Sequence, residues 1–188
     1  FRQEGGRVNT QTNAQSSDTE PTVRKIVRAE NTENTACTCA QNVMKYHDMH
    51  VMQELEIPED KIDAFFKEVP MASHNQRVRG FLCVETDDDI VVPLEQIVNV
   101  LKESMSAKIF ELLKRGDESY VVMAAHKNAR FVEDCVREMA RKVVNTVTYL
   151  PGDTHITIRQ TTAESIHQPD TYAARKATHA DLPAKQNI

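Results

Sequence analysis

The sequence predicts an α+β fold, in which an antiparallel sheet carries helices packed on one face. Segments rich in β-branched residues occur near the start, in the middle and near the end, at 23–28, 77–86 and 155–162. Helical stretches lie between these strands and do not alternate with them one by one, a pattern typical of α+β folds. The chain has only 5 Gly and no glycine-rich phosphate loop, which argues against dinucleotide-binding and P-loop folds.

The bulk composition is that of a globular protein. The 188 residues are 40% hydrophobic and 27% charged, enough for one domain with its own core. A formal net charge of −5 predicts no general attraction to nucleic acid or to anionic lipid. No apolar run approaches the roughly 20 residues of a membrane span. Four Cys without a secretory signal predict a cytoplasmic protein with free or metal-bound thiols.

The chain divides into three predicted parts. Residues 1–20 are polar and almost free of apolar side chains, so we expect a disordered leader. Residues 21–174 form the folded module, which begins with a short strand at 23–28. Residues 175–188 are predicted to be a polar tail, with fraying from Ala173 onward.

Helical periodicity dominates the first half of the module. Thr35 is a candidate cap for a helix at 40–55, whose apolar stripe consists of Val43, Met44, His47, Val51 and Leu55. Pro58 ends this helix, and a short helix is expected at 60–68. His74 then lies in a polar loop before the strand at 77–86.

The second half contains two further helical regions before the last strand. Pro93 begins a helix through Met105, and a second helical stretch at 106–115 is expected to end at Gly116. Residues 120–124 could be strand or helix. Asn128 is expected to cap a helix at 129–147, with a buried edge formed by Phe131, Cys135, Met139 and Val143.

Cys37 and Cys39 form a Cys-x-Cys pair at the start of the first helix. Residues two apart on a helix point to nearly opposite sides, which disfavours a closed structural zinc site. A thiol at a helix N-terminus instead has a lowered pKa, so Cys37 is a candidate metal ligand or nucleophile. The alternative is that both residues are small buried apolar groups. His74 is either a second ligand or an ordinary surface residue.

Several other polar groups allow two interpretations. Lys114 and Arg115 are basic residues at a predicted helix C-terminus, where the helix dipole alone favours them. In the functional interpretation, they contact phosphates and Glu118 binds a metal. Glu133 lies in the first turn of a helix, where acids are favoured anyway. Glu164 and His167 follow the last strand. They are either an acid/base site or ordinary polar residues where the chain leaves the strand.

Five motifs in order make the pattern specific. They are the segments 35–41 (TACTCAQ), 72–77 (ASHNQR), 109–118 (IFELLKRGDE), 128–134 (NARFVED) and 164–167 (ESIH). Over about 35–174 the chain resembles the C-terminal half of the GTP cyclohydrolase family of the tunnelling fold. That family includes the bacterial type IB enzyme and the archaeal MptA type of methanopterin synthesis. The Cys-x-Cys-Ala-Gln run resembles the archaeal type.

The resemblance implies a tunnelling-fold catalytic module over 21–174 with an open metal site. The implied ligands are Cys37, His74 and Glu118. One thiolate, one imidazole and one carboxylate leave positions for water, as a catalytic site requires. Iron(II) is the metal that the archaeal resemblance favours, and zinc or manganese would also fit.

The remaining site residues are assigned by the same resemblance. Glu133 is the expected guanine anchor, because an ionised carboxylate accepts hydrogen bonds from N1–H and the exocyclic amine. His167 is the expected proton-transfer residue, with Glu164 beside it. Candidate phosphate contacts are Arg77, Lys114 and Arg115.

The implied activity is opening of the guanine imidazole ring of GTP, with release of formate and formation of 7,8-dihydroneopterin 2′,3′-cyclic phosphate. Alternatives are the type IB product, 7,8-dihydroneopterin triphosphate, a non-catalytic metal- or pterin-binding module, and a thiol redox protein built on Cys37 and Cys39. The expected partners are GTP and either a second copy of the chain in a homo-oligomer such as a homodimer, or a separate N-terminal module. Two residues depart from the family pattern: Thr38 replaces the usual Pro, and Pro169 stands where a second His is frequent.

Overall fold

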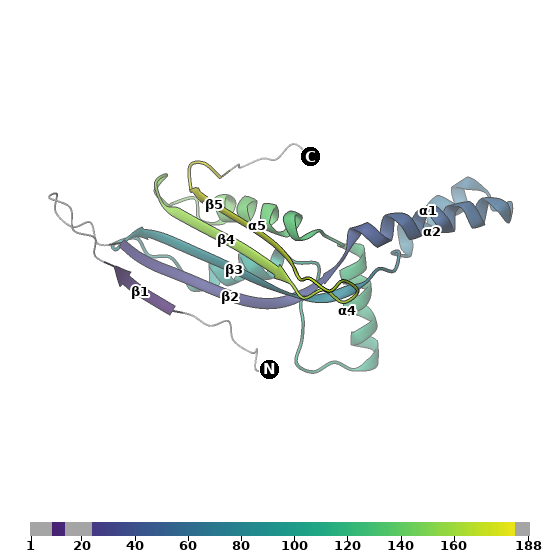
Figure 1. The fold of residues 1–188 in the computed structure, drawn as a ribbon, viewed down its shortest axis with the longest axis horizontal. Coiled ribbons are helices and arrows are strands. Elements are labelled where there is room, and N and C mark those ends of the chain that lie inside the picture. Colours follow the sequence, from purple (N-terminus) through teal and green to yellow (C-terminus); the bar gives the residue numbers. More distant parts are fainter. Residues whose placement is uncertain (1–8, 14–23, 183–188) are drawn as a thin grey trace.

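The computed structural model describes residues 9–13 and 24–182. Its centre is a five-stranded antiparallel sheet in the order β1-β2-β3-β4-β5. The strands are β1 (Asn9–Asn13), β2 (Arg24–Ala36), β3 (Asn75–Asp87), β4 (His155–Thr162) and β5 (Thr171–Thr178). The helices are α1 (Thr38–Glu54), α2 (Glu59–Glu68), α3 (Leu94–Glu103), α4 (Arg115–Lys127) and α5 (Val132–Thr146). The predicted α+β class is confirmed (Figure 1).

One face of the sheet carries the core. Residues of β3 alternate strictly between buried and more exposed positions, as a strand with one covered face requires. Leu82 of β3 and Ile158 of β4 pack in one cluster with Leu101 of α3 and Met139 of α5. Helices α3 and α5 lie behind the same face of the strands in Figure 1. The prediction that helices cover one face is therefore confirmed for these two helices.

Two predictions about the chain ends are wrong within the described residues. Asn9–Asn13, inside the predicted disordered leader, pairs with Arg24–Arg28 of β2 as an edge strand. Ala173 and the first residues of the predicted polar tail pair with β4 as part of β5, and Leu182 is buried. Edge strands are held by backbone hydrogen bonds, so a polar composition does not exclude them. The rest of the predicted leader and the end of the tail lie outside the described residues.

The predicted helix at 106–115 is also wrong. This segment is held against β2 by hydrogen bonds. Asn34 and Ala107 exchange backbone hydrogen bonds of 3.1 Å, and the Glu33 carboxylate accepts from the Ile109 N–H at 2.8 Å. Helix α4 begins only at Arg115, so Gly116 lies in its first turn and does not end a helix. Residues 120–124, which could have been strand or helix, belong to α4.

Three predicted helix features differ in the structure. Thr35 does not cap α1, because it belongs to β2 and its hydroxyl lies 2.8 Å from that of Ser106. Asn128 ends α4, and α5 begins after Phe131, three residues later than predicted. Of the predicted buried edge of α5, Phe131 is exposed, whereas Cys135, Met139 and Val143 are buried as expected.

Helix α1 has no buried residue, although its apolar stripe predicted a packed face. Val43 and Leu55 are 72% and 67% exposed. Figure 1 shows why: α1 and α2 extend together beyond the end of the sheet, away from the core. The periodicity predicted the helix correctly but not its surroundings. None of the helices in the described ranges is both long and apolar enough to cross a membrane.

Candidate metal centre

The pairing of β2 with β3 brings the two predicted sulfur and nitrogen ligands together. The register ends with Ala36 opposite Asn75, so Cys37 and His74 follow at the same end of the sheet. The Cys37 N–H donates to the His74 carbonyl at 3.2 Å. The Sγ atoms of Cys37 and Cys39 lie 2.6 Å apart, and Cys39 Sγ lies 3.7 Å from His74 Nε2. Cys37, Cys39 and His74 thus present three ligand atoms within 4.8 Å of one another.

Cys39 therefore belongs to the cluster, a role that the sequence did not predict. The expectation that the two thiols point to opposite sides applies only inside a helix. Cys37 is instead the N-cap of α1, with extended backbone angles of φ −80° and ψ 133°, and its sulfur accepts from the Cys39 N–H. A cap residue outside the helix turns its side chain back over the first turn. Recognising Cys37 as the cap would have revealed the pairing.

The Cys37 pKa is raised in the structure, whereas the sequence predicted that the helix N-terminus lowers it. Burial raises the pKa of the Cys37 thiol, and its contact with Cys39 raises it further. The backbone N–H groups of Cys39 and Ala40 lower it, but by less. Burial and the neighbouring thiol thus outweigh the effect of the helix N-terminus on the Cys37 pKa. A divalent cation at the cluster would supply the missing positive charge.

His74 is oriented for metal binding by its neighbours. Gln76 donates its amide N–H to Glu164 Oε1 at 3.1 Å, so the Gln76 oxygen faces His74 Nδ1 at 2.6 Å. A carboxylate can only accept, which fixes the amide, and the ring hydrogen then belongs on Nδ1. The lone pair of Nε2 is left facing Cys39. Ligating histidines characteristically donate their other N–H to such an acceptor.

Glu164 supports this arrangement from behind. Its side chain and that of His74 are only 6% and 8% exposed, and Glu164 Oε2 lies 3.7 Å from His74 Nδ1. The hydroxyl of Thr171 in β5 also donates to Glu164 at 3.1 Å. Two sulfurs and an oriented imidazole suit a borderline or soft divalent metal such as iron(II) or zinc. The donor chemistry therefore fits the expected metal, with Cys39 as an additional ligand candidate.

The cluster forms one wall of a cavity of about 210 Å³. Glu133 from the first turn of α5 lines the same cavity, as do Glu164 and His167 from the β4–β5 connection. The His167 ring lies edge-on to His74, with 6.1 Å between ring centroids. Arg130, to which the sequence assigned no role, also lines it. Five of the predicted site residues, Cys37, His74, Glu133, Glu164 and His167, thus share one pocket.

Four predicted site residues are not brought to this cavity. Glu118 is exposed on α4 and is not among the lining residues. Lys114 and Arg115 lie at the N-terminus of α4, the opposite helix end from the one predicted. Arg77 is exposed on β3, next to the buried Gln76 and on the other face of the sheet. Their assignments as metal ligand and phosphate contacts remain predictions.

The comparison with known families agrees with the motifs. The family model described as type I GTP cyclohydrolase folE2 matches residues 3–173. The chain belongs to this family. The match begins well before residue 35, where the motifs begin, and so includes most of the predicted leader.

Individual relatives are close. The chain is 75% identical over 175 residues to GTP cyclohydrolase MptA of Methanocorpusculum labreanum, covering 93% of this chain and 56% of the relative. It is 61% identical over 180 residues to GTP cyclohydrolase MptA of Methanoculleus marisnigri, covering 96% and 58%. A similar match to GTP cyclohydrolase MptA of Methanoregula boonei is 61% identical over 181 residues, covering 96% and 56%. The chain spans about half the length of the curated relatives it matches.

Proposed function

We propose that this chain carries the metal-binding and guanine-binding site of a GTP cyclohydrolase of the MptA type. The observation that carries the proposal is a single cavity lined by Cys37, Cys39, His74 and Glu133. The relatives are named GTP cyclohydrolase, which supports GTP as the substrate. The cysteines and His74 can bind a metal that activates water, and Glu133 can bind the guanine edge. Hydrolytic opening of a purine ring requires both functions in one pocket.

Two waters react at C8 and one is returned later, so the net reaction consumes one water. The first water adds to C8 of guanine and the C8–N9 bond breaks, which leaves C8 as a formamide on N7. The second water hydrolyses this formamide, the C8–N7 bond breaks, and C8 leaves as formate. The sugar then rearranges to a ketone, whose carbonyl condenses with the freed N7 amine to close the pterin ring and release one water. In the product proposed here, a sugar hydroxyl also attacks the α-phosphorus and diphosphate leaves, which gives 7,8-dihydroneopterin 2′,3′-cyclic phosphate. If the triphosphate is retained, the product is the type IB compound, 7,8-dihydroneopterin triphosphate.

A divalent metal bound at the cluster, with iron(II) preferred, would supply a Lewis acid that makes the water nucleophilic. Glu133 holds the guanine edge by accepting hydrogen bonds from N1–H and the exocyclic amine. His167, on the rim beside His74, moves protons to and from the reacting nitrogen. Glu164 acts through Gln76 and His74, so it is a positioning residue.

The test is a formate-release assay with GTP and iron(II), using the chain in the context of the complete protein. Wild type is compared with Cys37→Ala and Glu133→Ala. We expect formate from wild type and a loss of at least about a hundredfold in each variant, since each removes a group that contacts metal or substrate. Undiminished activity in both variants would overturn the site assignment.

Two rivals give different results in the same assay. A binding module that does not turn over substrate would bind metal and guanine nucleotide but release no formate. A thiol redox protein has one point in its favour, the 2.6 Å separation of the Cys37 and Cys39 sulfurs. It predicts disulfide cycling that survives in a Glu118→Ala variant and requires both thiols.

A further inference from the structure

A second cavity of about 220 Å³ lies where α1, α2 and the end of α4 meet. Its lining residues are Gln41, Asn42, Lys45, Phe66, Lys67, Pro70, Met71, His126 and Lys127. None of them lines the pocket of the metal cluster. Three are lysines and none is acidic, in a chain with 28 acidic and 23 basic residues.

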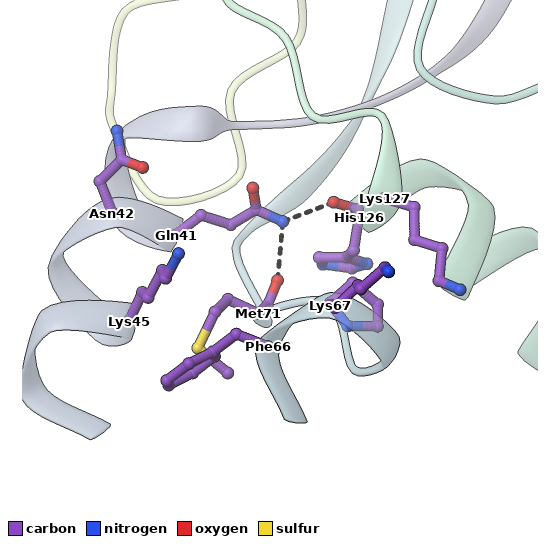
Figure 2. Close-up of a pocket in the computed structure, with 9 residues that line it drawn as sticks. Gln41, Asn42, Lys45, Phe66, Lys67, Met71, His126 and Lys127 are labelled. Atoms are coloured by element: carbon purple, nitrogen blue, oxygen red, sulfur yellow. Dashed lines mark hydrogen bonds between the residues drawn. The ribbon is translucent and has the colours of Figure 1, made fainter. Parts of the chain in front are cut away.

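The three lysines come from three different helices. Lys45 lies in α1, Lys67 in the last turn of α2, and Lys127 is the last residue of α4. Figure 2 shows Lys45 on one side of Gln41 and Lys127 on the other. The helix dipole accounts for a lysine in the last turn of α2 or α4, but not for Lys45 within α1. Among the residues that the structure describes, no carboxylate lies within 4.0 Å of these ammonium groups.

Two hydrogen bonds to the backbone hold the Gln41 side chain in this cavity. The Gln41 amide donates to the Met71 carbonyl at 2.7 Å and to the His126 carbonyl at 2.6 Å (Figure 2). These bonds occupy two carbonyl oxygens whose negative ends would otherwise repel an anion. Phe66 adds an apolar wall, with Lys45 Nζ 5.4 Å from its ring centroid. An apolar wall strengthens the attraction between the lysines and a bound anion.

We propose that this cavity binds a polyphosphate group through Lys45, Lys67 and Lys127. Three ammonium groups around a small pocket match the multiple charges and acceptor oxygens of linked phosphates. The polyphosphate could belong to a nucleoside triphosphate or to a free inorganic chain. The chemistry recognised is the same in both cases.

Hydrogen bonds to the backbone of residues 71–74 connect this cavity to the metal cluster. His126 Nε2 lies 3.0 Å from the Ser73 carbonyl, and the Ser73 hydroxyl donates to the Cys37 carbonyl at 2.6 Å. Residues 71–74 therefore join the two cavities. The polyphosphate site nevertheless stands independently of the proposed catalysis, because anion binding needs no turnover.

The test is calorimetric titration of the protein with sodium tripolyphosphate. The triple variant Lys45→Gln, Lys67→Gln, Lys127→Gln should bind at least about tenfold more weakly than wild type. A matched triple variant, Lys61→Gln, Lys108→Gln, Lys176→Gln, removes the same charge from exposed lysines elsewhere and should retain wild-type affinity. All six side chains are exposed, and equal melting temperatures would show that both variants fold.

Titration in the presence of GTP or guanosine identifies the source of the phosphates. Competition by GTP but not guanosine assigns the site to a nucleotide triphosphate, and absence of competition assigns it to a free anion; both outcomes support the site. Equal losses in the two triple variants, or no binding by wild type, would overturn it. Cys37→Ala should bind tripolyphosphate normally, so failure of the catalytic proposal is distinguished from failure of this one.

Discussion

At the scale of single residues, Glu33 is a buried carboxyl that holds the chain after α3 against β2. It is 3% exposed and accepts from the Asn31 amide at 2.7 Å as well as from the Ile109 N–H. Burial raises the pKa of Glu33, an effect that its hydrogen bonds only partly offset. A raised folded-state pKa means that folded protein holds this proton more tightly than unfolded protein does. The resulting stabilisation is complete below the unfolded pKa and is lost as pH rises through the folded pKa.

Glu33→Gln should therefore gain stability relative to wild type as pH rises from 4 to 7. The substitution also weakens the hydrogen bonding of residue 33. The cost of this change is the same at every pH, so it does not alter the trend. The free energy of unfolding, measured by urea denaturation across this range, gives the difference. Glu103→Gln should show the opposite sign, because a hydrogen bond from Lys142 lowers the pKa of the exposed Glu103. A pH-independent difference for Glu33→Gln would contradict the prediction.

Two glycines give opposite expectations for the same substitution. A Cβ on Gly80 in β3 would lie 2.5 Å from Met105 Cε and 3.2 Å from Leu101 Cδ2. We expect Gly80→Ala to lower the free energy of unfolding by about 1–3 kcal/mol, the usual cost of overpacking a core. A Cβ on Gly116 meets nothing within 4 Å, so Gly116→Ala should raise it by roughly 0.4–1 kcal/mol. Denaturant unfolding of both variants checks the pair, and equal effects would refute it.

At the scale of elements, the start of β3 and the β4–β5 connection together orient His74. Gln76 is the link, because it contacts both the imidazole and Glu164. We expect Gln76→Ala to weaken metal binding by about 10–100-fold, the usual effect of removing such a supporting contact. Titration with cobalt(II), followed by its thiolate charge-transfer absorption, measures this affinity.

Asn75→Ala is the matched control for Gln76, since neighbouring strand residues point to opposite faces. It should retain wild-type cobalt affinity. Cys37→Ala should lose the charge-transfer band. If Gln76→Ala binds cobalt as tightly as wild type, Gln76 does not position the ligand.

At the scale of the whole molecule, exposed apolar side chains gather on α4 and the segment before it. Leu112 is 81% exposed, Phe110 51% and Val122 48%. Apolar side chains at this density are typical of association surfaces. The predicted homo-oligomer should therefore dissociate in the double variant Leu112→Ser, Val122→Ser. Val91→Ser, at a 75% exposed position on another part of the molecule, should leave the mass measured by light scattering unchanged. A wild-type monomer would contradict the prediction.

The sequence by itself determined the family, the α+β class and five of the residues that line the cavity of the proposed site. These depend on residue type and order: alternation places Ile156 and Ile158 in the core, and the motifs single out Cys37, His74 and Glu133, which line one cavity. Local patterns failed where partners distant in the chain compete with them. Contacts to β2 keep 106–114 out of a helix. Backbone pairing with β4 builds β5, and Ala173 and Ala177 of this strand pack against the core.

Only the tertiary structure decided how the site is assembled. The register of β2 against β3 brings Cys37 beside His74, and the N-cap conformation of Cys37 places its sulfur against Cys39. The β4–β5 connection then supplies Glu164 behind the imidazole. Residues 37, 74 and 164 are separated by long stretches of chain, and no local propensity encodes their distances. Long-range strand pairing fixes them, which is why the sequence could name Cys37 and His74 as candidate ligands but could not place Cys39 beside them.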